Sequence, residues 1–315
     1  MNRTPNRAVD TREIRALDAR VSSHVALGFL LLCAVPVLTA WNLLPPLFRL
    51  VLNNDTFSQI PLIPLVTLFL IYDRRKSIFS DLSFGWMFGA ALIVPGMLLV
   101  VVARLDLLHL TSTNPLSLLV FAIVLVWLGA FALFFGKRAF WSACFPLVFL
   151  FFMVPIPEPF LSRTIYYLQA GSSSMAAIFF GIARVPFLRQ EGFVFQLPGF
   201  AIRVAEECSG IRSTLALLIT TVLASNMFLT SSWRRVVLCA VVAPLAIFKN
   251  GLRIATLCIL AIHVDPGFLY GKLHRRGGFV FFLIALVPLG LLLIWFHKSE
   301  NRSGRAPLPQ SAHSA

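Results

Sequence analysis

The stretch Val-Ala-Glu-Glu-Cys-Ser-Gly-Ile-Arg-Ser, residues 204–213, lies where a polar part of the chain meets an apolar run at residues 214–229. An apolar run that follows a polar segment in this way is typical of a helix that enters a membrane. The junction therefore places Cys208 at a membrane surface and at the start of a helix. Unpaired N–H groups and the helix dipole at such a start favour an anion, so the thiol should ionise more readily there than in a free cysteine.

The composition excludes a soluble globular protein. Apolar residues make up 58% of the 315 residues and charged residues 13%, whereas soluble domains carry roughly a quarter charged residues. The mean hydropathy is +0.84. The net charge of +14 is explained by lysine and arginine in cytoplasmic loops rather than by binding to nucleic acid. The fold class is therefore an all-α polytopic membrane protein.

We expect about eight transmembrane helices, because the sequence holds eight long apolar runs. They are residues 21–44, 57–72, 84–103, 115–135, 139–154, 209–229, 236–263 and 279–296. A polar, arginine-rich segment at residues 1–20 is expected to be a disordered cytoplasmic tail. The transmembrane domain then covers residues 21–297, and residues 298–315 form a second cytoplasmic tail.

Residues 161–183 leave two topologies open. The segment is weakly apolar and carries a Gly-Ser-Ser-Ser run, so it can either span the membrane or lie flat on it. The version without this span puts more lysine and arginine on the cytoplasmic side, as membrane proteins prefer. It places both termini in the cytoplasm and makes residues 155–207 a loop region on the outer face, next to Cys208.

Part of this region is expected to be extended. Residues 184–207 contain an alternation of side chains at 193–197, followed by the turn signal Pro198-Gly199. Alternation with a period of two, ended by such a turn, indicates strands.

Only Cys208 among the five cysteines has polar neighbours. The others lie in apolar runs, where cysteine behaves as a small hydrophobic residue; they are Cys33, Cys144, Cys239 and Cys258. Their spacing fits neither a zinc site nor a disulfide framework, so we expect no metal and no organic cofactor. Ser209 can cap the following helix, Gly210 permits close approach of the backbone, and the N–H groups after Cys208 can form an oxyanion hole.

Arg253 lies inside an apolar run, where a buried arginine is costly and should face a polar cavity or a partner. Two interpretations remain. It forms an ion pair with Glu206 or Glu207, or it is a permanent charge that holds a thiolate or a developing oxyanion. Asn250 can orient it, and Lys249, four residues earlier, can share its helix face.

The two glutamates before the cysteine disfavour a thiolate. Arg212, Arg253 or Arg203 can neutralise them. Glu206 is the better candidate for an inward-facing partner of an arginine, and Glu207 for an exposed residue.

His274 also allows two interpretations. A loop histidine beside two arginines is often a solvated surface residue. The Gly277-Gly278 pair that precedes an apolar run instead suggests a tight return into the membrane. As a base, His274 can accept the thiol proton and later donate it to a leaving amine; His263 is the second candidate for this role.

These motifs resemble those of the exosortase/archaeosortase family, and of bacterial exosortases in particular. The similarity rests on residues 205–213, 250–254 and 274–278, in that order along the chain, together with the proline-rich step at 154–157 and the segment 192–199. It covers most of the chain from about residue 57 to 296.

The resemblance implies a membrane cysteine protease or transpeptidase. Such enzymes cleave a C-terminal sorting signal of exported proteins, of the PEP-CTERM type: a Pro-Glu-Pro motif, a transmembrane helix and a basic tail. Carried over by position, Cys208 is the nucleophile, Arg253 the essential arginine and His274 the histidine. The implied setting is the inner membrane of a Gram-negative cell, near exopolysaccharide genes, with the active site facing the periplasm. A cell-surface acceptor or water would receive the cleaved protein.

Two other function classes compete with this one. In a polytopic transporter or permease, Lys249 and Arg253 would bind an anionic substrate, but its charges should lie near the bilayer midplane and an internal repeat is often visible. A transferase that uses a lipid-linked sugar would need carboxylates, and the 13 acidic residues are scattered. The cysteine transpeptidase is the best-supported prediction.

Overall fold

The computed structural model describes residues 11–109, 114–269 and 278–303. Within these ranges the side chains of residues 11–23, 55, 207, 208, 269 and 303 lie outside the description. The chain divides into two compact units, unit 1 up to Glu158 and unit 2 from Pro159 onward. Each unit is described by itself.

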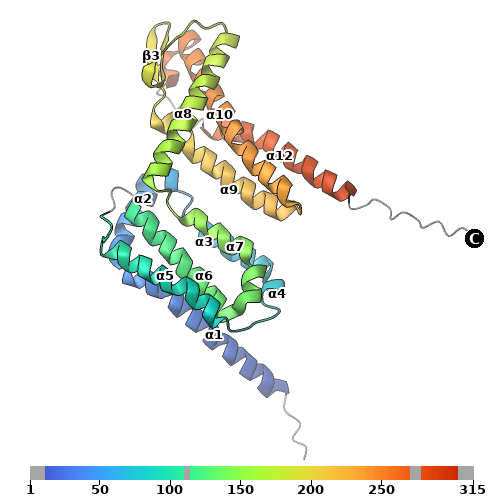
Figure 1. Ribbon diagram of the computed structural model, residues 1–315. Coiled ribbons are helices and arrows are strands. Elements are labelled where there is room, and N and C mark those ends of the chain that lie inside the picture. The colour runs from blue at the N-terminus through green and yellow to red at the C-terminus, as the bar shows by residue number, and fades with distance from the viewer. Residues whose placement is uncertain (1–10, 110–113, 270–277, 304–315) are drawn as a thin grey trace, which may run out of the picture. The chain divides into compact units, whose positions relative to one another are not determined.

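Unit 1 is helical throughout its regular elements (Figure 1). These are α1 (Thr11–Thr39), η1 (Trp41–Leu43), α2 (Leu44–Asn53), η2 (Asp55–Phe57), α3 (Leu62–Asp73), α4 (Arg75–Ile78), α5 (Trp86–Arg104), α6 (Asn114–Ser142), α7 (Cys144–Phe149) and η3 (Leu150–Met153).

The pair α5 and α6 forms the centre of unit 1, and glycine lets the two helices approach closely. An added Cβ at Gly89 would lie 2.6 Å from the Cβ of Leu133, and one at Gly129 would lie 2.7 Å from Ile93. Small residues at such contacts are a common means of packing helices in membranes. Around them lie aromatic rings such as Phe131, which is 3% exposed.

Unit 2 combines four long helices with a small sheet (Figure 1). Its elements are α8 (Glu158–Ile182), β1 (Leu188–Gln190), η4 (Glu191–Phe193), β2 (Val194–Leu197), β3 (Phe200–Arg203), η5 (Glu206–Ser209), α9 (Ile211–Phe228), α10 (Ser232–His263), η6 (Pro266–Leu269) and α12 (Gly278–Ser303).

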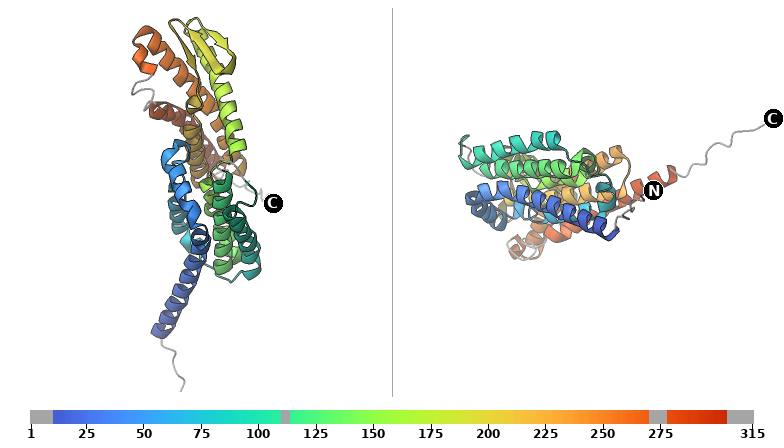
Figure 2. Two further views of the ribbon diagram at one scale, coloured as in Figure 1. Left: turned by 90° about the vertical axis from the view of Figure 1, so that its left-hand side faces the viewer. Right: turned by 90° about the horizontal axis from the view of Figure 1, so that it is seen from below.

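The sheet confirms that the segment before Cys208 is extended. Its strands are antiparallel in the order β1-β2-β3, and Gly199 makes the turn between β2 and β3 with φ +89°. On β2, Phe195 and Leu197 are buried. They pack with residues of α8 and of the C-terminal half of α10, such as Phe180 and Cys258. Figure 2 shows the sheet beside these helix ends.

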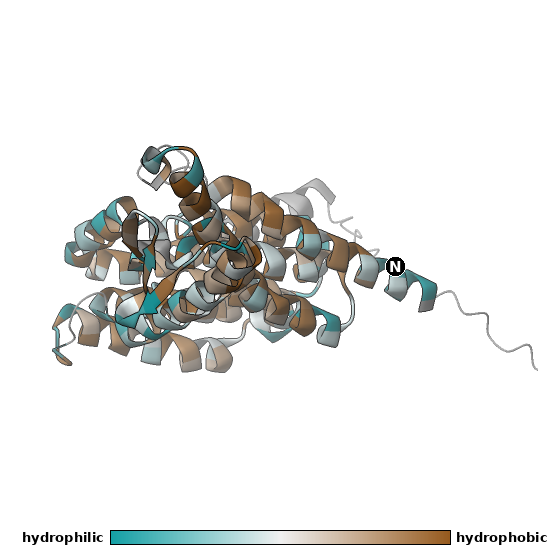
Figure 3. Ribbon diagram, turned by 90° about the horizontal axis from the view of Figure 1, so that it is seen from above, coloured by the Kyte–Doolittle hydropathy of each residue, from teal (hydrophilic) through white to brown (hydrophobic). Residues whose placement is uncertain are grey.

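Five helices in the described residues are long and apolar enough to cross a membrane, namely α5, α6, α9, α10 and α12, or up to seven if each of two bent helix pairs is one span. Most of the helical ribbon carries hydrophobic residues (Figure 3). This confirms an all-α polytopic membrane protein. Helix α3 is apolar but too short to count as a candidate span. The number of about eight transmembrane helices and the cytoplasmic placement of the termini stay predictions.

The expectation that residues 155–207 form a loop region is wrong for its first half. Residues 158–182 form the 25-residue helix α8. The Gly-Ser-Ser-Ser run does not break it, because these small residues face α10: an added Cβ at Gly171 would lie 2.8 Å from Ile247, and Ser172 and Ser173 are fully buried. Helices also extend into both expected tails, since α1 begins at Thr11 and α12 ends at Ser303.

Candidate active site

Cys208 lies on η5, a short turn that joins the sheet to α9. The segment before it is fixed on both sides. The N–H of Val204 donates to the carbonyl of Phe193 at 3.0 Å, and the side-chain amide of Gln169 on α8 donates to the carbonyl of Val204, also at 3.0 Å. The segment that leads to Cys208 is thus held at Val204 by η4 and α8, while the Cys208 side chain lies outside the description.

Gly210 lets the chain turn sharply into α9. It has φ +77°, a left-handed conformation that costs a residue with a Cβ roughly 1–2 kcal/mol. It is also buried against α10, because an added Cβ would lie 3.0 Å from Oδ1 of Asn250. Both observations agree with the expectation that Gly210 serves close approach of the backbone.

The expectation that Cys208 precedes a helix is confirmed, because α9 begins at Ile211. Gly210, rather than Ser209, occupies the capping position. Ser209 is buried, and its hydroxyl accepts the N–H of Ile211 at 3.3 Å. The first N–H groups of a helix carry a partial positive charge, so Cys208 stands next to a site that favours negative charge.

Helix α10 contributes the polar side chains that lie under this turn. Lys249 is 3% exposed and Asn250 1% exposed. The ammonium of Lys249 donates to the hydroxyl of Ser213 in the first turn of α9, and Nδ2 of Asn250 donates to the hydroxyl of Ser172 on α8 at 3.0 Å. Asn250 therefore connects α8, α10 and the turn at Gly210.

Arg253 follows one helical turn after Lys249 and is half-buried. Because α10 has 32 residues and α9 has 18, at 1.5 Å per residue α10 is longer by roughly 20 Å. Lys249 is level with the start of α9, so Arg253 lies beyond that start, on the side of η5. The described part of the chain shows no ion pair between Arg253 and Glu206; the Glu207 side chain is outside it.

The remaining predicted residues are more dispersed. Arg212 is exposed on α9. His274 lies outside the described residues. His263 is the last residue of α10 and is exposed; ten residues beyond Arg253, it lies roughly 15 Å away along the helix axis. The structure therefore does not bring His263 to Arg253.

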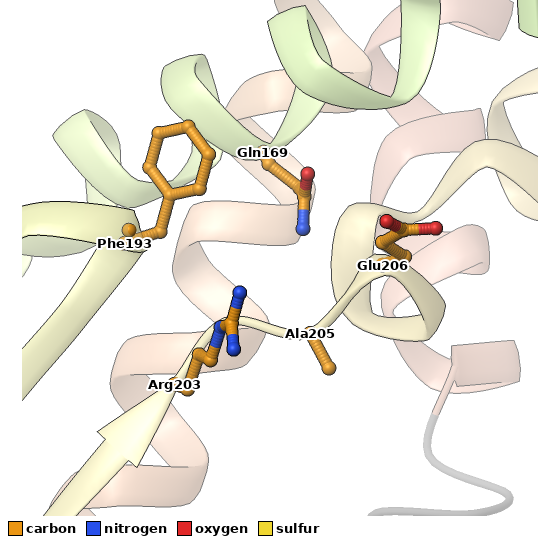
Figure 4. A pocket seen from close by; sticks show the side chains of 6 residues that line it. Gln169, Phe193, Arg203, Ala205 and Glu206 are labelled. Atoms are coloured by element: carbon orange, nitrogen blue, oxygen red, sulfur yellow. The ribbon is translucent and has the colours of Figure 1, made fainter. Parts of the chain in front are cut away.

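A cavity of about 330 Å³ adjoins the turn on the side of the sheet. Its lining is Gln169, Gly192, Phe193, Arg203, Ala205 and Glu206. Figure 4 shows the side chains of Gln169 and Arg203 pointing toward each other across it, with Glu206 at one end. Glu206 is thus exposed at the cavity. In the part of the chain that the structure describes, no cluster of three or more His, Cys, Asp or Glu residues could hold a metal ion.

Three residues of this site were not singled out from the sequence. Gln169 and Ser172 lie on α8, in the segment for which the sequence left open whether it spans the membrane or lies flat on it. Lys249 was considered as a neighbour of Arg253 and, with it, as an anion-binding residue of the transporter alternative, but not as part of the cysteine site. Its four-residue spacing from Arg253 was the available signal, but its contact with Ser213 depends on how α9 and α10 pack.

A family model described as transmembrane exosortase (Exosortase_EpsH) matches residues 51–291, which is more than half of the chain and includes the positions of Cys208, Arg253 and His274. Comparison with curated proteins and with solved structures finds no match.

Proposed function

The chain belongs to the transmembrane exosortase family, a family of cysteine-type transpeptidases, and from this premise we propose that it cleaves a C-terminal sorting signal of the PEP-CTERM type with Cys208 as the nucleophile. The observation that carries the proposal is the placement of Cys208 on a fixed turn directly before the N-terminus of α9, beside the end of the bundle where α10 carries Arg253.

The proposed chemistry needs four events. The Cys208 thiolate attacks the scissile carbonyl, forming a C–S bond and a tetrahedral oxyanion. Arg253 and the backbone N–H groups at the start of α9 stabilise that oxyanion. The C–N bond then breaks, and the leaving amine takes the proton that His274 received from the thiol. The resulting thioester is released by an amine acceptor or by water.

We propose that this site faces the periplasm from the inner membrane of a Gram-negative cell. The supporting observation is that the topology without a separate span at residues 161–183 puts more lysine and arginine on the cytoplasmic side than the topology with it. The substrates are then exported proteins whose C-terminal helix lies in the same bilayer, and a cell-surface acceptor is the partner for transfer.

The experiment is to co-express the protein with an exported substrate that ends in a Pro-Glu-Pro type signal, and to compare Cys208→Ala with a matched control, Cys239→Ala. Cys239 is a half-buried cysteine of α10, so the control removes a thiol away from the site. We expect processing to stop in Cys208→Ala and to continue in Cys239→Ala at equal membrane levels. Normal processing by Cys208→Ala would refute the proposal.

The transporter alternative has one observation in its favour, the burial of Lys249 in a candidate span. However, the ammonium of Lys249 donates to the hydroxyl of Ser213 in the first turn of α9, and α9 is itself an 18-residue candidate span. A helix of that length is roughly 27 Å long, close to the thickness of a hydrocarbon core, so its first turn lies at one boundary of that core rather than at the midplane. The position fits a site at the membrane surface better.

A further inference from the structure

Lys249 is the one charged side chain that is fully buried among those the structure describes, at 3% exposure. Burial of an ammonium group is costly unless a partner compensates it. Its one hydrogen bond within the described residues goes to the neutral hydroxyl of Ser213, and none of the described carboxylates pairs with it. This burial, with a hydroxyl of α9 as the described partner, directs attention to the turn that Ser213 contacts.

The contact with Ser213 continues to the backbone of the turn. The Ser213 hydroxyl donates to the carbonyl of Gly210 at 3.0 Å. The same carbonyl accepts the N–H of Thr214 at 2.9 Å and its hydroxyl at 2.8 Å. Lys249 is therefore linked through one side chain to a carbonyl two residues after Cys208.

A second positive charge stands nearby on the same helix. Arg253 follows Lys249 by four residues, so the two lie on one helix face, where like charges repel. The helix N-terminus of α9 adds a partial positive charge at the same level. These three positive contributions, at the same end of the α9–α10 pair, are stabilised when an anion is present, and a thiolate or a tetrahedral oxyanion is such an anion.

Other charged groups near the turn belong to three elements, and all of them influence an anion there. They are Arg203 on β3, Glu206 and Glu207 on η5, and Arg212 on α9. The face of α8 that contacts the site brings neutral groups, Gln169 and Ser172. Among those whose side chains the structure describes, Lys249 alone is buried, so its charge is less screened by water than theirs.

We propose that Lys249 is a positioning residue for the thiol chemistry: through Ser213 it holds the turn that follows Cys208, and its charge favours the anionic forms of the reaction at that turn. The inference rests on the proposed function and adds a residue to it.

The test uses the full chain in membranes and measures two properties. The first is processing of the substrate. The second is the rate at which iodoacetamide alkylates Cys208 between pH 6 and pH 9, measured by mass spectrometry of the peptide that contains Cys208. The variants are Lys249→Met, Lys249→Arg and Ser213→Ala. Thr221→Val is the matched control, because Thr221 is buried like Lys249, and within the described part of the chain its hydroxyl bonds inside α9, to the carbonyl of Leu217 at 2.6 Å.

Because the thiolate is the reactive form, the alkylation rate follows its population. We expect Lys249→Met to lower alkylation at pH 7 about tenfold, which corresponds to a shift of about one pH unit in the profile, and to slow processing by at least as much. Lys249→Arg should recover most of the alkylation rate and most of the processing. Ser213→Ala should give values between those of Lys249→Met and the wild type, and Thr221→Val should match the wild type.

Unchanged alkylation and processing in Lys249→Met would overturn the inference and leave the proposed function intact. Equal losses of processing in Lys249→Met and Lys249→Arg, with unchanged alkylation profiles, would reduce Lys249 to a structural residue and also overturn it. If Lys249→Met fails to accumulate, a wild-type profile in Ser213→Ala would decide against it. Processing that survives Cys208→Ala but not Ser213→Ala would instead overturn the proposed function, leaving Ser213 with Lys249 as the reactive pair.

Discussion

Unit 1 and unit 2 both contain candidate membrane spans, but their interiors differ. Among the described residues, the buried polar side chains of unit 1 are Thr67 and Ser117, whereas those of unit 2 are Gln169, Ser172, Ser173, Ser209, Thr221, Ser225, Lys249 and Asn250. Unit 1 is filled by glycine contacts between α5 and α6 and by clustered phenylalanine rings.

The difference shows that the chain buries polar side chains, which is energetically costly, mainly in unit 2. Helices that meet through apolar and small residues need only good packing. A buried polar side chain must instead find a hydrogen-bonding partner, or it destabilises the protein. In unit 2, five of these side chains lie around the turn that carries Cys208, namely Gln169, Ser172, Ser209, Lys249 and Asn250. This makes unit 2 the expected seat of activity.

The largest effect should come from Arg253→Gln in unit 2, compared with Arg104→Gln at the exposed end of α5 in unit 1. Removing one group that stabilises an oxyanion lowers rates roughly 10²–10³-fold, so we expect a loss of processing of that size in Arg253→Gln. Arg104→Gln should process normally. The rate of substrate maturation in pulse-chase experiments measures both, and equal rates would remove the functional distinction between the units.

The sequence predicted the membrane class and most helix positions, because long apolar runs have few other stable arrangements. It also predicted the strands before Cys208, where alternation and Pro198-Gly199 act locally. It left residues 161–183 open between a span and a segment lying flat, and the loop expected over residues 155–207 was wrong there, because the Gly-Ser-Ser-Ser run of α8 packs against α10. The partner of Gly171 is Ile247, far along the chain, and no local pattern reveals that contact.

Only some residues of the candidate site could be predicted from the sequence. Cys208, Gly210 and Arg253 stand in compact motifs, so residue type and neighbours were enough to select them. Lys249 and Gln169 acquire their importance from tertiary contacts, with Ser213 and with the carbonyl of Val204. The spacing along one chain fixes a helix face, but not which neighbouring helix covers it.

Gly89→Ala tests the packing of unit 1. The new methyl group would lie 2.6 Å from the Cβ of Leu133 and 2.8 Å from its backbone, so one helix must shift. Overpacking of this kind costs typically about 1–3 kcal/mol. We expect a lower unfolding temperature in detergent with normal processing per folded molecule. Gly290→Ala on α12, where nothing lies within 4 Å, is the control and should be at least as stable as the wild type.

Gly210→Ala should differ from Gly89→Ala in its effect on processing. Its left-handed φ of +77° costs alanine roughly 1–2 kcal/mol, and the methyl group presses on Asn250. This strain should lower the unfolding temperature about as much as Gly89→Ala does. Because it falls on the turn after Cys208, we also expect processing per folded molecule to fall about tenfold, the factor that about 1.4 kcal/mol represents. A variant that unfolds early but processes normally would show that the turn is structural.

The smallest effect is expected at a second polar cluster of unit 2, which lies at the other end of α9. Glu300 of α12 accepts the N–H groups of Thr230 and Ser231 at 2.9 and 3.0 Å, and it lies 3.4 Å from Arg234. It thereby caps the start of α10 and fastens α12 to it. Glu300→Gln keeps the shape but removes the charge, so the free energy of unfolding should fall by about 1 kcal/mol.

Processing per folded molecule should be unchanged in Glu300→Gln, because 18 residues of α9 separate this cluster from the turn at Cys208. Urea unfolding measures the first quantity and substrate maturation the second. Loss of processing at normal stability would mean that polar burial anywhere in unit 2 serves activity. The expected result limits the functional part of unit 2 to one end of the α9–α10 pair. At that end the buried Lys249 has no carboxylate partner among the described residues, whereas Arg234 at the other end pairs with Glu300.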